Sequence, residues 1–574
     1  HLGGTTPITI GNSSSSITFA FNGILNAGSG TLSFAKGGTG TATGVAAGTK
    51  NELVLNAASG NLAFTAPIYD GSLASQVTVE SSPANAVIFS GANGYSGDTV
   101  ITTGTLQLGA ANVIPDGSGK GNVTVNGTLD LNTFSDTING LSGTGIIDTV
   151  AGGTPTLTVG NNNVSSTFSG VLRNSGGTLS LTKTGSGTLT LTSSSSYTGT
   201  TTIGTGGGAS VLRAAATQAL GVGGTIAFDA TGNASPARLE LIGDITIGNP
   251  INFAGRNNTN VGIENISGNN TLTGPITLAI GGGTYLIQSD AGTLTLGSPG
   301  NTAITSTGSK TVTLQGSANG IVSGDIVNGA GVAVFKTGLG TWTLAGNNSY
   351  ANGTAIGAGK LLVNGTLGGT ITVSNGATLG GSGVLNGTVL LQPGSVLSPG
   401  NSIGTLTFNN DLDLASTTLL EISKAPLAND QIVVNGAITY DGTLTVVNLG
   451  GSLTAGDAFR LFNAASVSGN FATLNLPALN PGLAWDFNES SGWLTIVPTV
   501  ATNPTNLLTS IVGGNLTLAW PADHLGWRLQ VQTNAQSVGL FTNWFDVVGS
   551  TATNAVDLPI GKNSGSVFYR LIYP

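Results

Sequence analysis

A phrase of alternating apolar and hydroxyl residues, broken by glycine corners, constrains the fold of this chain more than any other feature. It is clearest at residues 177–203, where Leu179, Leu181, Leu189 and Leu191 alternate with Thr or Ser. Alternation with a period of two is typical of a β-strand with one buried face. Because the phrase returns along most of the chain, the sequence predicts an all-β architecture of stacked strands, with Leu189 pointing inward.

A short motif, Gly-Thr-Leu/Trp-x-apolar, opens many of these strands. Glycine supplies a corner at which φ can be positive, and the residues after it suit a strand. Some copies lie about twenty residues apart, and a strand-only repeat of that length predicts a β-solenoid. The best helical candidate, residues 211–220, is expected to form one or two turns at most. The motif occurs at Gly30, Gly104, Gly127, Gly177, Gly187, Gly292, Gly340, Gly404 and Gly442.

The composition excludes several classes of protein. Only 7% of the residues are charged, against about 25% in ordinary soluble proteins. The net charge is −9 and the 16 Lys and Arg residues are scattered, so that no basic patch for a nucleic-acid partner is expected. Without cysteine there can be no disulfide and no thiolate metal site. No apolar run reaches the ~18 residues that a membrane helix needs.

The chain begins at His1 and contains no methionine. This start predicts a secreted protein whose signal peptide has been removed, and an extracellular or cell-surface location.

Three stretches resemble the autotransporter-associated β-strand repeat. They are 181–203, 335–363 with Tyr350 in it, and a weaker copy from Val87 to Leu106. Residues 370–497 resemble the C-terminal part of autotransporter passengers. The resemblance implies a long right-handed parallel β-helix. Only about 75 residues follow Pro498, and their pattern is unlike a membrane barrel, so we expect a passenger-type chain without that anchor.

The sequence predicts three segments. Residues 1–497 form the β-solenoid, residues 498–506 a linker rich in Pro, Thr and Asn, and residues 507–574 a small aromatic-rich module. Short strand signals with frequent turns predict an antiparallel β-sandwich for this module. The module is similar to terminal modules on exported repeat proteins of environmental bacteria, which implies no activity. The expected strands are 516–520, 527–532, 544–548, 555–558 and 567–573.

The charged residues offer few candidates for chemistry. Asp411 and Asp413 share a strand face and could act as an acid pair or hold Ca²⁺, but a solvated outer face explains them as well. A looser acidic group, made of Asp130, Asp136 and Asp148, is open to the same two interpretations. A third group, of mixed charge, is either a shallow binding face or a set of ion pairs between adjacent coils. It contains Arg213, Arg238, Arg256, Glu240, Asp244 and Glu264.

Three other features are interpreted as structural. His524 lies beside Asp523, with no Ser or Cys motif attached to it. The glycine-rich stretches 204–208 and 37–40 lack the Lys and Ser/Thr of a phosphate loop and are read as corners. The sequence therefore predicts a protein that is not an enzyme, with no catalytic residue, no cofactor and no bound metal.

These observations favour an extracellular structural role. An open β-solenoid end templates further pairing, and a head-to-tail contact that does not close produces a filament. We therefore expect a rod that assembles end to end with copies of itself. An adhesin or glycan-binding protein is the alternative, and a polysaccharide-degrading enzyme is the weaker third. The candidate assembly contacts are Pro7, Ile8, Ile10, Trp520, Trp527, Trp544, Phe568, Tyr569 and Tyr573.

Overall fold

The computed structural model describes residues 8–10, 18–37, 44–48, 51–231, 234–327, 331–480, 482–561 and 565–573. They form two compact units, the first made of residues 1–401 and 406–410, the second of 402–405 and 411–574. Apart from two short 3-10 helices, the regular elements of the described residues are β-strands. The all-β prediction is confirmed.

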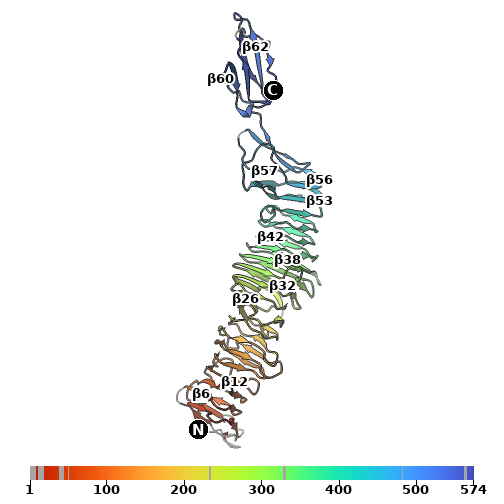
Figure 1. The fold of residues 1–574 in the computed structure, drawn as a ribbon. Coiled ribbons are helices and arrows are strands. Elements are labelled where there is room, and N and C mark those ends of the chain that lie inside the picture. The colour runs from red at the N-terminus through yellow and green to blue at the C-terminus, as the bar shows by residue number, and fades with distance from the viewer. Residues whose placement is uncertain are drawn as a thin grey trace. The chain divides into compact units, whose positions relative to one another are not determined.

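Unit 1 is a parallel β-solenoid, in which each strand pairs with the strand one coil further along the chain. Leu361 pairs with Leu379, and Leu379 with Leu397, so that a coil there takes 18 residues. Elsewhere coils are longer, as between Leu106 and Leu129. Figure 1 shows these coils stacked in chain order from red to green. The predicted solenoid is therefore confirmed.

The strands of unit 1 group into stacked parallel sheets. The first three sheets contain β1 (Ile8–Ile10), β4 (Leu32–Lys36), β7 (Leu62–Phe64), β10 (Ala86–Phe89), β12 (Thr105–Leu108), β14 (Thr128–Asp130), β17 (Ile146–Asp148) and β20 (Val171–Leu172); β3 (Gly23–Leu25), β6 (Glu52–Ala57), β9 (Gln76–Ser81), β11 (Thr99–Ile101), β13 (Val123–Val125) and β16 (Leu141–Ser142); and β2 (Thr18–Phe21), β5 (Gly44–Ala47) and β8 (Ile68–Tyr69).

Two longer sheets follow in the chain. They contain β15 (Asp136–Ile138), β18 (Thr156–Val159), β21 (Ser180–Lys183), β23 (Thr201–Ile203), β25 (Ile226–Phe228), β28 (Ile251–Phe253), β31 (Ile276–Leu278), β34 (Thr302–Ser306) and β37 (Asp325–Ile326); and β19 (Ser166–Phe168), β22 (Thr188–Leu191), β24 (Val211–Ala214), β26 (Arg238–Ile242), β29 (Arg256–Ser267), β32 (Gly282–Ser289), β35 (Lys310–Gln315), β38 (Val332–Lys336), β41 (Thr354–Ile356), β44 (Ile371–Val373) and β47 (Val389–Leu391).

The last strands of unit 1 lie on two further faces. They are β27 (Thr246–Ile247), β30 (Asn269–Leu272), β33 (Thr293–Leu296), β36 (Asn319–Val322), β39 (Thr341–Leu344), β42 (Lys360–Val363), β45 (Thr378–Gly381) and β48 (Val396–Pro399); and β40 (Asn347–Asn348), β43 (Thr366–Leu367), β46 (Val384–Leu385) and β49 (Thr405–Phe408).

Apolar side chains in register build the core of unit 1. Leu189 of β22 pairs with Leu212, which pairs with Leu239, and the ladder continues through Ile263 and Ile287. All five side chains are fully buried, and from Leu189 to Ile287 each lies in register with the next member of the ladder one coil further on. The inward assignment of Leu189 is therefore confirmed.

Aromatic residues form a second ladder in the first coils. Phe34, Phe64 and Phe89 occupy the same register on β4, β7 and β10. The rings of Phe34 and Phe64 stack with centroids 5.1 Å apart, and Phe64 meets Phe89 edge-on at 6.2 Å. Both arrangements are favourable for aromatic pairs, so that the ladder stabilises the stacking of these coils.

The helical candidate at 211–220 is wrong for its first residues. Val211–Ala214 form strand β24, which pairs with β22 and β26. Leu212 and Ala214 are buried while Arg213 points outward, which is a period of two. Pairing with the coils on both sides outweighs the helix propensity of the alanines.

Gly320 leaves room for the indole of Trp342 in the next coil. The two residues pair on β36 and β39, Trp342 is fully buried, and a Cβ atom on Gly320 would lie 2.4 Å from its ring. We expect Gly320→Val to lower the free energy of unfolding by about 3 kcal/mol, because the added side chain would overlap the buried ring. Thermal unfolding measures the loss, and Gly283→Ala, where nothing lies within 4 Å of the added atom, is the matched control. Equal melting temperatures for the two variants would contradict this packing.

Unit 2 begins with further parallel strands and then changes direction. Parallel pairs join β50 to β53, β53 to β56, β51 to β54 and β54 to β57. An antiparallel hairpin, β58 with β59, follows and also pairs with β55. The bounds are β50 (Leu412–Leu414), β51 (Thr417–Lys424), β52 (Leu427–Asn429), β53 (Gln431–Tyr440), β54 (Thr443–Asn448), β55 (Ala458–Arg460), β56 (Phe462–Gly469), β57 (Thr473–Asn475), β58 (Leu483–Asn488) and β59 (Trp493–Pro498).

The β58–β59 hairpin packs on the last parallel strands through an aromatic cluster. Phe487 of the hairpin lies 5.9 Å from Tyr440 and 6.0 Å from Phe462, measured between ring centroids, and Phe471 joins the same cluster. The alternation pattern did not predict this antiparallel hairpin, because its strands carry the same short apolar runs as the strands of the coils.

The C-terminal residues of unit 2 form two antiparallel sheets, as predicted. One has the order β60-β61-β64 and the other β63-β62-β65. Their shared core contains Leu518, Trp520 and Leu529. We call residues 507–573 the C-terminal module; its elements are β60 (Leu508–Val512), β61 (Asn515–Ala519), η1 (Ala522–His524), β62 (Arg528–Asn534), β63 (Phe545–Asp546), η2 (Ser550–Ala552), β64 (Ala555–Pro559) and β65 (Ser566–Ile572).

Candidate functional site

Three buried tyrosines form the same corner in three coils. Tyr95, Tyr197 and Tyr350 are fully buried. Each hydroxyl lies within hydrogen-bond distance of the threonine hydroxyl four residues later, 2.6 Å at Thr99, 2.6 Å at Thr201 and 2.7 Å at Thr354. Burial raises the pKa of all three tyrosines, so that they stay neutral. Because each threonine begins a strand (β11, β23 and β41), the bond fixes where the chain turns into the next face.

Two buried lysines bind the turns that follow their strands. Lys183 ends β21 and Lys336 ends β38, and neither is exposed by more than 1%. Lys336 Nζ donates to the carbonyls of Thr337, Gly338 and Ala358 at 2.8, 2.8 and 3.0 Å. Lys183 donates to the carbonyls of Thr184 and Gly185. Desolvation lowers the pKa of each lysine to about 8. These cations stabilise corners.

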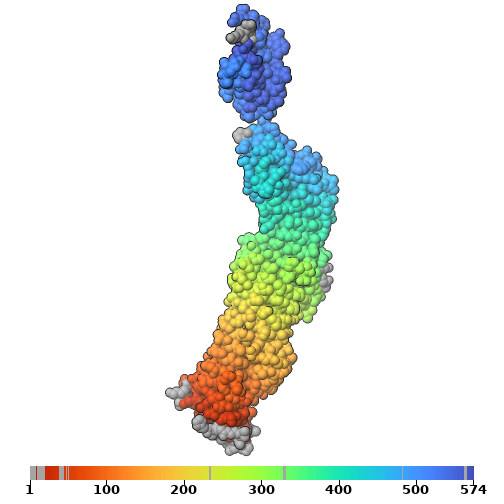
Figure 2. Space-filling view, in the orientation of Figure 1, coloured from red at the N-terminus to blue at the C-terminus, as the bar shows by residue number. Residues whose placement is uncertain are grey.

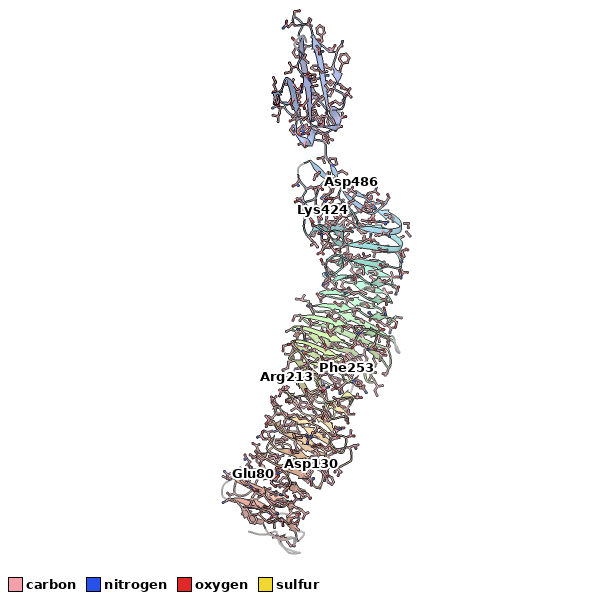
Figure 3. The ribbon with its side chains drawn as sticks, viewed as in Figure 1. Glu80, Asp130, Arg213, Phe253, Lys424 and Asp486 are labelled. Carbon is pink, nitrogen blue, oxygen red and sulfur yellow. The ribbon has the colours of Figure 1, made fainter. Side chains whose placement is uncertain are left out.

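An ion ladder crosses three adjacent coils on the outer surface of unit 1. Glu240 on β26 lies 2.6 Å from Arg213 on β24 and 2.6 Å from Arg238, which also lies 2.9 Å from Glu264 on β29. Figure 3 labels Arg213 in this region. Burial, opposed by Arg238 and reinforced by the acid Asp290, raises the pKa of Glu264 to about 7. Of the two interpretations of this neighbourhood, the contacts are those of ion pairs between coils.

Arg256 does not belong to this surface ladder. Its side chain is fully buried, and its guanidinium lies 5.1 Å from the ring centroids of Phe228 and Phe253. It donates to the carbonyls of Ser235 and Ala237. Burial lowers the pKa of Arg256 to about 10. Sequence reasoning missed this inward cation, because charged residues are normally exposed.

The candidate acids are held by neighbouring coils. Asp130, labelled in Figure 3, accepts from Gln107 Nε2 at 2.8 Å and from the Val150 amide at 3.1 Å. Asp148 pairs with Arg173 at 2.7 Å.

Asp411 binds the neighbouring coil, whereas Asp413 lies on the solvated outer face. Asp411 accepts from the amide of Ala437 at 2.7 Å, and Asp413 is exposed between the buried Leu412 and Leu414. Asp244 accepts from the amide of Asn269. Within the described part of the chain, no three His, Asp or Glu side chains come together in a way that could hold a metal ion.

Of the two glycine-rich stretches predicted to be corners, 204–208 lies wholly within the described residues and 37–40 does not. Residues 204–208 form a turn, with φ of 90° at Gly204 and 62° at Gly206, which confirms that stretch as a corner. Residues 38–40 of the other stretch lie outside the described residues.

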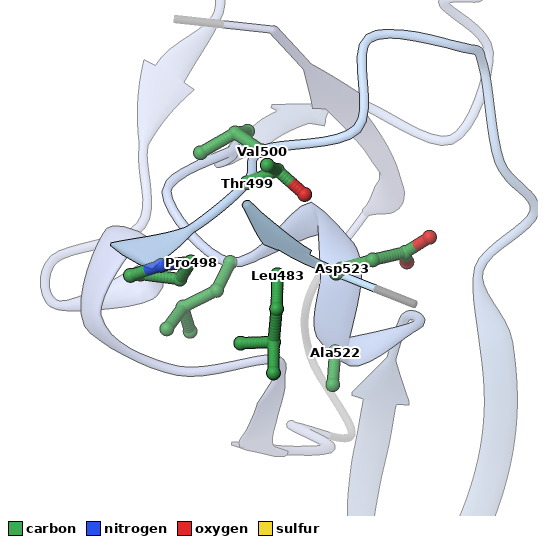
Figure 4. Close-up of a pocket in the computed structure, with 8 residues that line it drawn as sticks. Leu483, Pro498, Thr499, Val500, Ala522 and Asp523 are labelled. Carbon is green, nitrogen blue, oxygen red and sulfur yellow. The ribbon is translucent and has the colours of Figure 1, made fainter. Parts of the chain in front are cut away.

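His524 clamps the segment that leads into the C-terminal module. Its side chain is 2% exposed, with Nδ1 2.7 Å from Asp523 Oδ1 and Nε2 2.7 Å from the carbonyl of Asn503. Both partners accept, so that the doubly protonated ring satisfies both. Burial works against this charge, but the bonds to Asn503 and Asp523 raise the pKa of His524 above its usual value. A hollow of about 280 Å³ lies beside the clamp, lined by Leu483, Pro498, Thr499, Val500, Ala522 and Asp523 (Figure 4).

The outer face of the β63-β62-β65 sheet carries an aromatic ring on a polar network. The guanidinium of Arg570 lies 4.3 Å from the ring centroid of Trp544. Arg570 Nε donates to Gln530 Oε1 at 2.9 Å, and Gln530 Nε2 donates to Asp546 Oδ1 at 2.8 Å. Arg528 Nη1 lies 3.2 Å from Asp546 Oδ2. Gln530 faces Asp546 and Arg570 in register across the three strands.

A sequence model of the passenger-associated-transport-repeat matches residues 84–108, 181–208 and 334–363. Each match contains one tyrosine corner with its threonine. This chain carries passenger repeats. All three stretches that resembled the family are confirmed.

Two curated proteins match parts of this chain. The adhesin BmaC autotransporter of Brucella suis biovar 1 (strain 1330) is 34% identical over 166 residues, which are 26% of this chain and 5% of that protein. An extracellular serine protease of Serratia marcescens is 33% identical over 126 residues, which are 22% of this chain and 12% of that protein. The chain therefore spans only a small part of either relative.

The candidate assembly residues fall in two places. Pro7 lies outside the described residues. Ile8 and Ile10 bound β1, an edge strand of its sheet among the described strands. In the module, Trp520 and Trp527 are buried, 2% and 5% exposed. Half-buried positions are held by Trp544, Phe568 and Tyr569, and Tyr573 is 50% exposed.

The hydroxyl of the buried tyrosine should stabilise each passenger repeat, and the effect of removing this hydroxyl should be measurable. We expect Tyr197→Phe to lower the free energy of unfolding by about 1 kcal/mol, because Thr201 Oγ1 loses its partner inside the corner. Thermal unfolding measures the change. Tyr573→Phe, at an exposed tyrosine, is the matched control and should leave the melting temperature unchanged. A Tyr197 variant as stable as this control would show that the hydroxyl pair adds nothing.

No helix in the described ranges is long and apolar enough to cross a membrane.

Proposed function

We propose that this chain is an extracellular structural protein, a surface-exposed passenger without enzymatic activity. The passenger repeats carry the proposal, and both curated relatives support export to or beyond the cell surface. The charged side chains support it as well, since the ion ladder, the buried lysines and the candidate acids bind other parts of the same chain. This chain covers only 12% of the extracellular serine protease, and we therefore do not propose protease activity for it.

The finer proposal is that copies of this chain join end to end into a fibre. The antiparallel hairpin β58–β59 packs on the last parallel strands of unit 2, which disfavours direct stacking of one solenoid on another at that place. The joint is therefore assigned to exposed apolar side chains of the C-terminal module, including Tyr573 at 50% exposure. On the next copy we assign it to the edge strand β1, by strand addition.

Electron microscopy and sedimentation over a range of concentrations test the fibre. We expect filaments whose length grows with concentration, and shorter assemblies for Tyr573→Ser, which removes a ring that is 50% exposed and lies 5.6 Å from the Trp527 ring, centroid to centroid. Thermal unfolding of this variant confirms that its module stays folded. Ser537→Ala, at an exposed residue in a turn of the same module, is the control and should assemble as the unaltered chain does. Monomers at every concentration would contradict end-to-end assembly and leave the passenger role in place.

Adhesion is the second candidate function, and the match to an autotransporter adhesin favours it. A fibre can also adhere, so that the two functions are compatible. Binding of the purified chain to whole cells, against an unrelated β-solenoid protein of similar charge, tests it. Retention above that control is expected; equal retention of the two proteins would contradict adhesion.

A further inference from the structure

Trp544 lies over the outer face of the β63-β62-β65 sheet with its position fixed from below. One side of the indole rests on the Arg570 guanidinium at 4.3 Å, a favourable cation–π contact. Arg570 is held in turn by Gln530, and Gln530 by Asp546. The ring is half-buried. It is therefore a flat aromatic surface that needs little reordering before it meets a ligand.

The loop that presents Trp544 is also fixed. Gln532, 2% exposed, donates to the carbonyl of Asn543 at 2.9 Å and accepts from the amide of Phe541 at 2.8 Å. Asn534 Nδ2 donates to the carbonyl of Gly539 at 2.6 Å. A buried amide from the sheet thus holds a loop on which Phe541 remains 61% exposed. Clustered exposed aromatic side chains are a mark of recognition surfaces.

We propose that this surface, the Trp544 platform of Trp544, Arg570, Gln530, Asp546 and Arg528, binds pyranose rings of a neutral polysaccharide. The inference rests on the proposed adhesive function and names its ligand class and its site. The C–H face of a β-linked pyranose is flat and apolar enough to pack on an indole. Its hydroxyls can donate to Asp546 and accept from Arg528 and Arg570, which are planar groups with several donors.

The charges at the platform favour a neutral polymer. Arg528 pairs with Asp546, an ion pair open to solvent with side-chain exposures of 38% and 49%, and the Arg570 guanidinium already lies against the Trp544 ring and donates to Gln530. An anionic polymer would have to compete with Asp546 for Arg528. An uncharged hydroxyl-rich chain meets no such competition, and its hydroxyls use the donors and the acceptor together.

Depletion of the full chain from solution by microcrystalline cellulose and by chitin tests the platform. We expect binding to at least one of these β-linked polymers. Trp544→Ala should weaken it by about tenfold, the loss expected when an aromatic anchor is removed, and Asp546→Ala should weaken it without removing any ring. Trp493→Ala, which removes a tryptophan 39% exposed on β59, is the matched control and should bind as the unaltered chain does. Thermal unfolding of the Trp544 variant confirms that its module is folded.

Failure of the platform and failure of adhesion are distinguishable. No depletion by either polymer, or equal depletion of the unaltered chain and both platform variants, overturns the platform. If whole-cell retention persists in the Trp544 variant while polysaccharide binding is absent, adhesion stands and uses another surface. If whole-cell retention is itself absent, the adhesive function fails.

Discussion

Leu189→Asp should lower the free energy of unfolding of unit 1 by several kcal/mol, about 4 or more. Leu189 is fully buried in β22, between Ser166 of the preceding coil and Leu212 of the next. A carboxylate at this place would leave water and find an apolar ladder on its far side, with no cation in it. The chain must then either hold an unpaired charge, protonate the acid or separate the coils.

Thr190→Asp is the matched control, one residue away on the same strand. Thr190 points outward and pairs in register with Arg213, so that the new carboxylate would meet solvent and a guanidinium. We expect its effect to lie within about 0.5 kcal/mol of zero, as for most exposed substitutions. Chemical denaturation followed by circular dichroism measures both variants. Losses of equal size would mean that the two faces of β22 are not distinguished in solution.

The contrast between Leu189 and Thr190 explains how much of the fold was predictable. A period of two records which side of a strand is buried, so that the coils, their inward residues and the parallel stacking could be derived from the sequence. The β58–β59 hairpin could not be derived. Its strands carry the same short apolar runs as those of the coils, and alternation alone does not show that the short turn between Asn488 and Trp493 brings the chain back as an antiparallel pair. Strand β60 was missed for a related reason, since all five of its residues are exposed and no alternation marks it.

The sequence predicted which aromatic residues belong to the candidate site region, but not which of them are buried and which lie on the surface. Aromatic enrichment near the C-terminus singled out Trp520, Trp527 and Trp544 together, because composition does not separate a core ring from a surface ring. The structure separates them: Trp520 belongs to the core of the module, the Trp527 indole donates to the carbonyl of Ala501 at 2.7 Å, and Trp544 lies over Arg570. Gln532, which fixes the loop before Trp544, carried no signal, since a buried amide looks like a surface one in sequence.

Asp136→Asn should stabilise unit 1 near neutral pH by up to about 4 kcal/mol, and should do little in acid. Asp136 is 1% exposed. Its Oδ2 accepts from the amides of Val113 at 2.9 Å and Ile114 at 3.3 Å, while its Oδ1 lacks a hydrogen-bond partner. Burial, reinforced by the nearby acid Asp116, raises the pKa of Asp136 from 3.8 to about 7, against the lowering effect of the amides of Val113, Ile114 and Thr137. The folded protein therefore keeps a proton that the unfolded chain has lost.

The direction of the pH effect follows from that difference in protons. Below pH 4 both states hold the proton, and the acid has its full stabilising value. Between about pH 4 and pH 7 only the folded state holds it, so that stability falls as the pH rises, and above pH 7 the loss is complete. An amide at this position cannot titrate. Its oxygen can keep the bonds to Val113 and Ile114, and its nitrogen replaces the unpartnered oxygen.

A nearby coil already uses an asparagine in this way. Asn93 accepts from the amide of Ile68 at 2.8 Å and donates to the carbonyl of Val113 at 2.8 Å, the same residue whose amide bonds to Asp136. Melting temperatures from pH 4 to pH 8 should therefore decline less for Asp136→Asn than for the unaltered chain. Asp413→Asn, at an exposed acid, should follow the unaltered chain. If all three proteins decline alike, Asp136 is ionised in the folded coil, and its second oxygen has found a donor there.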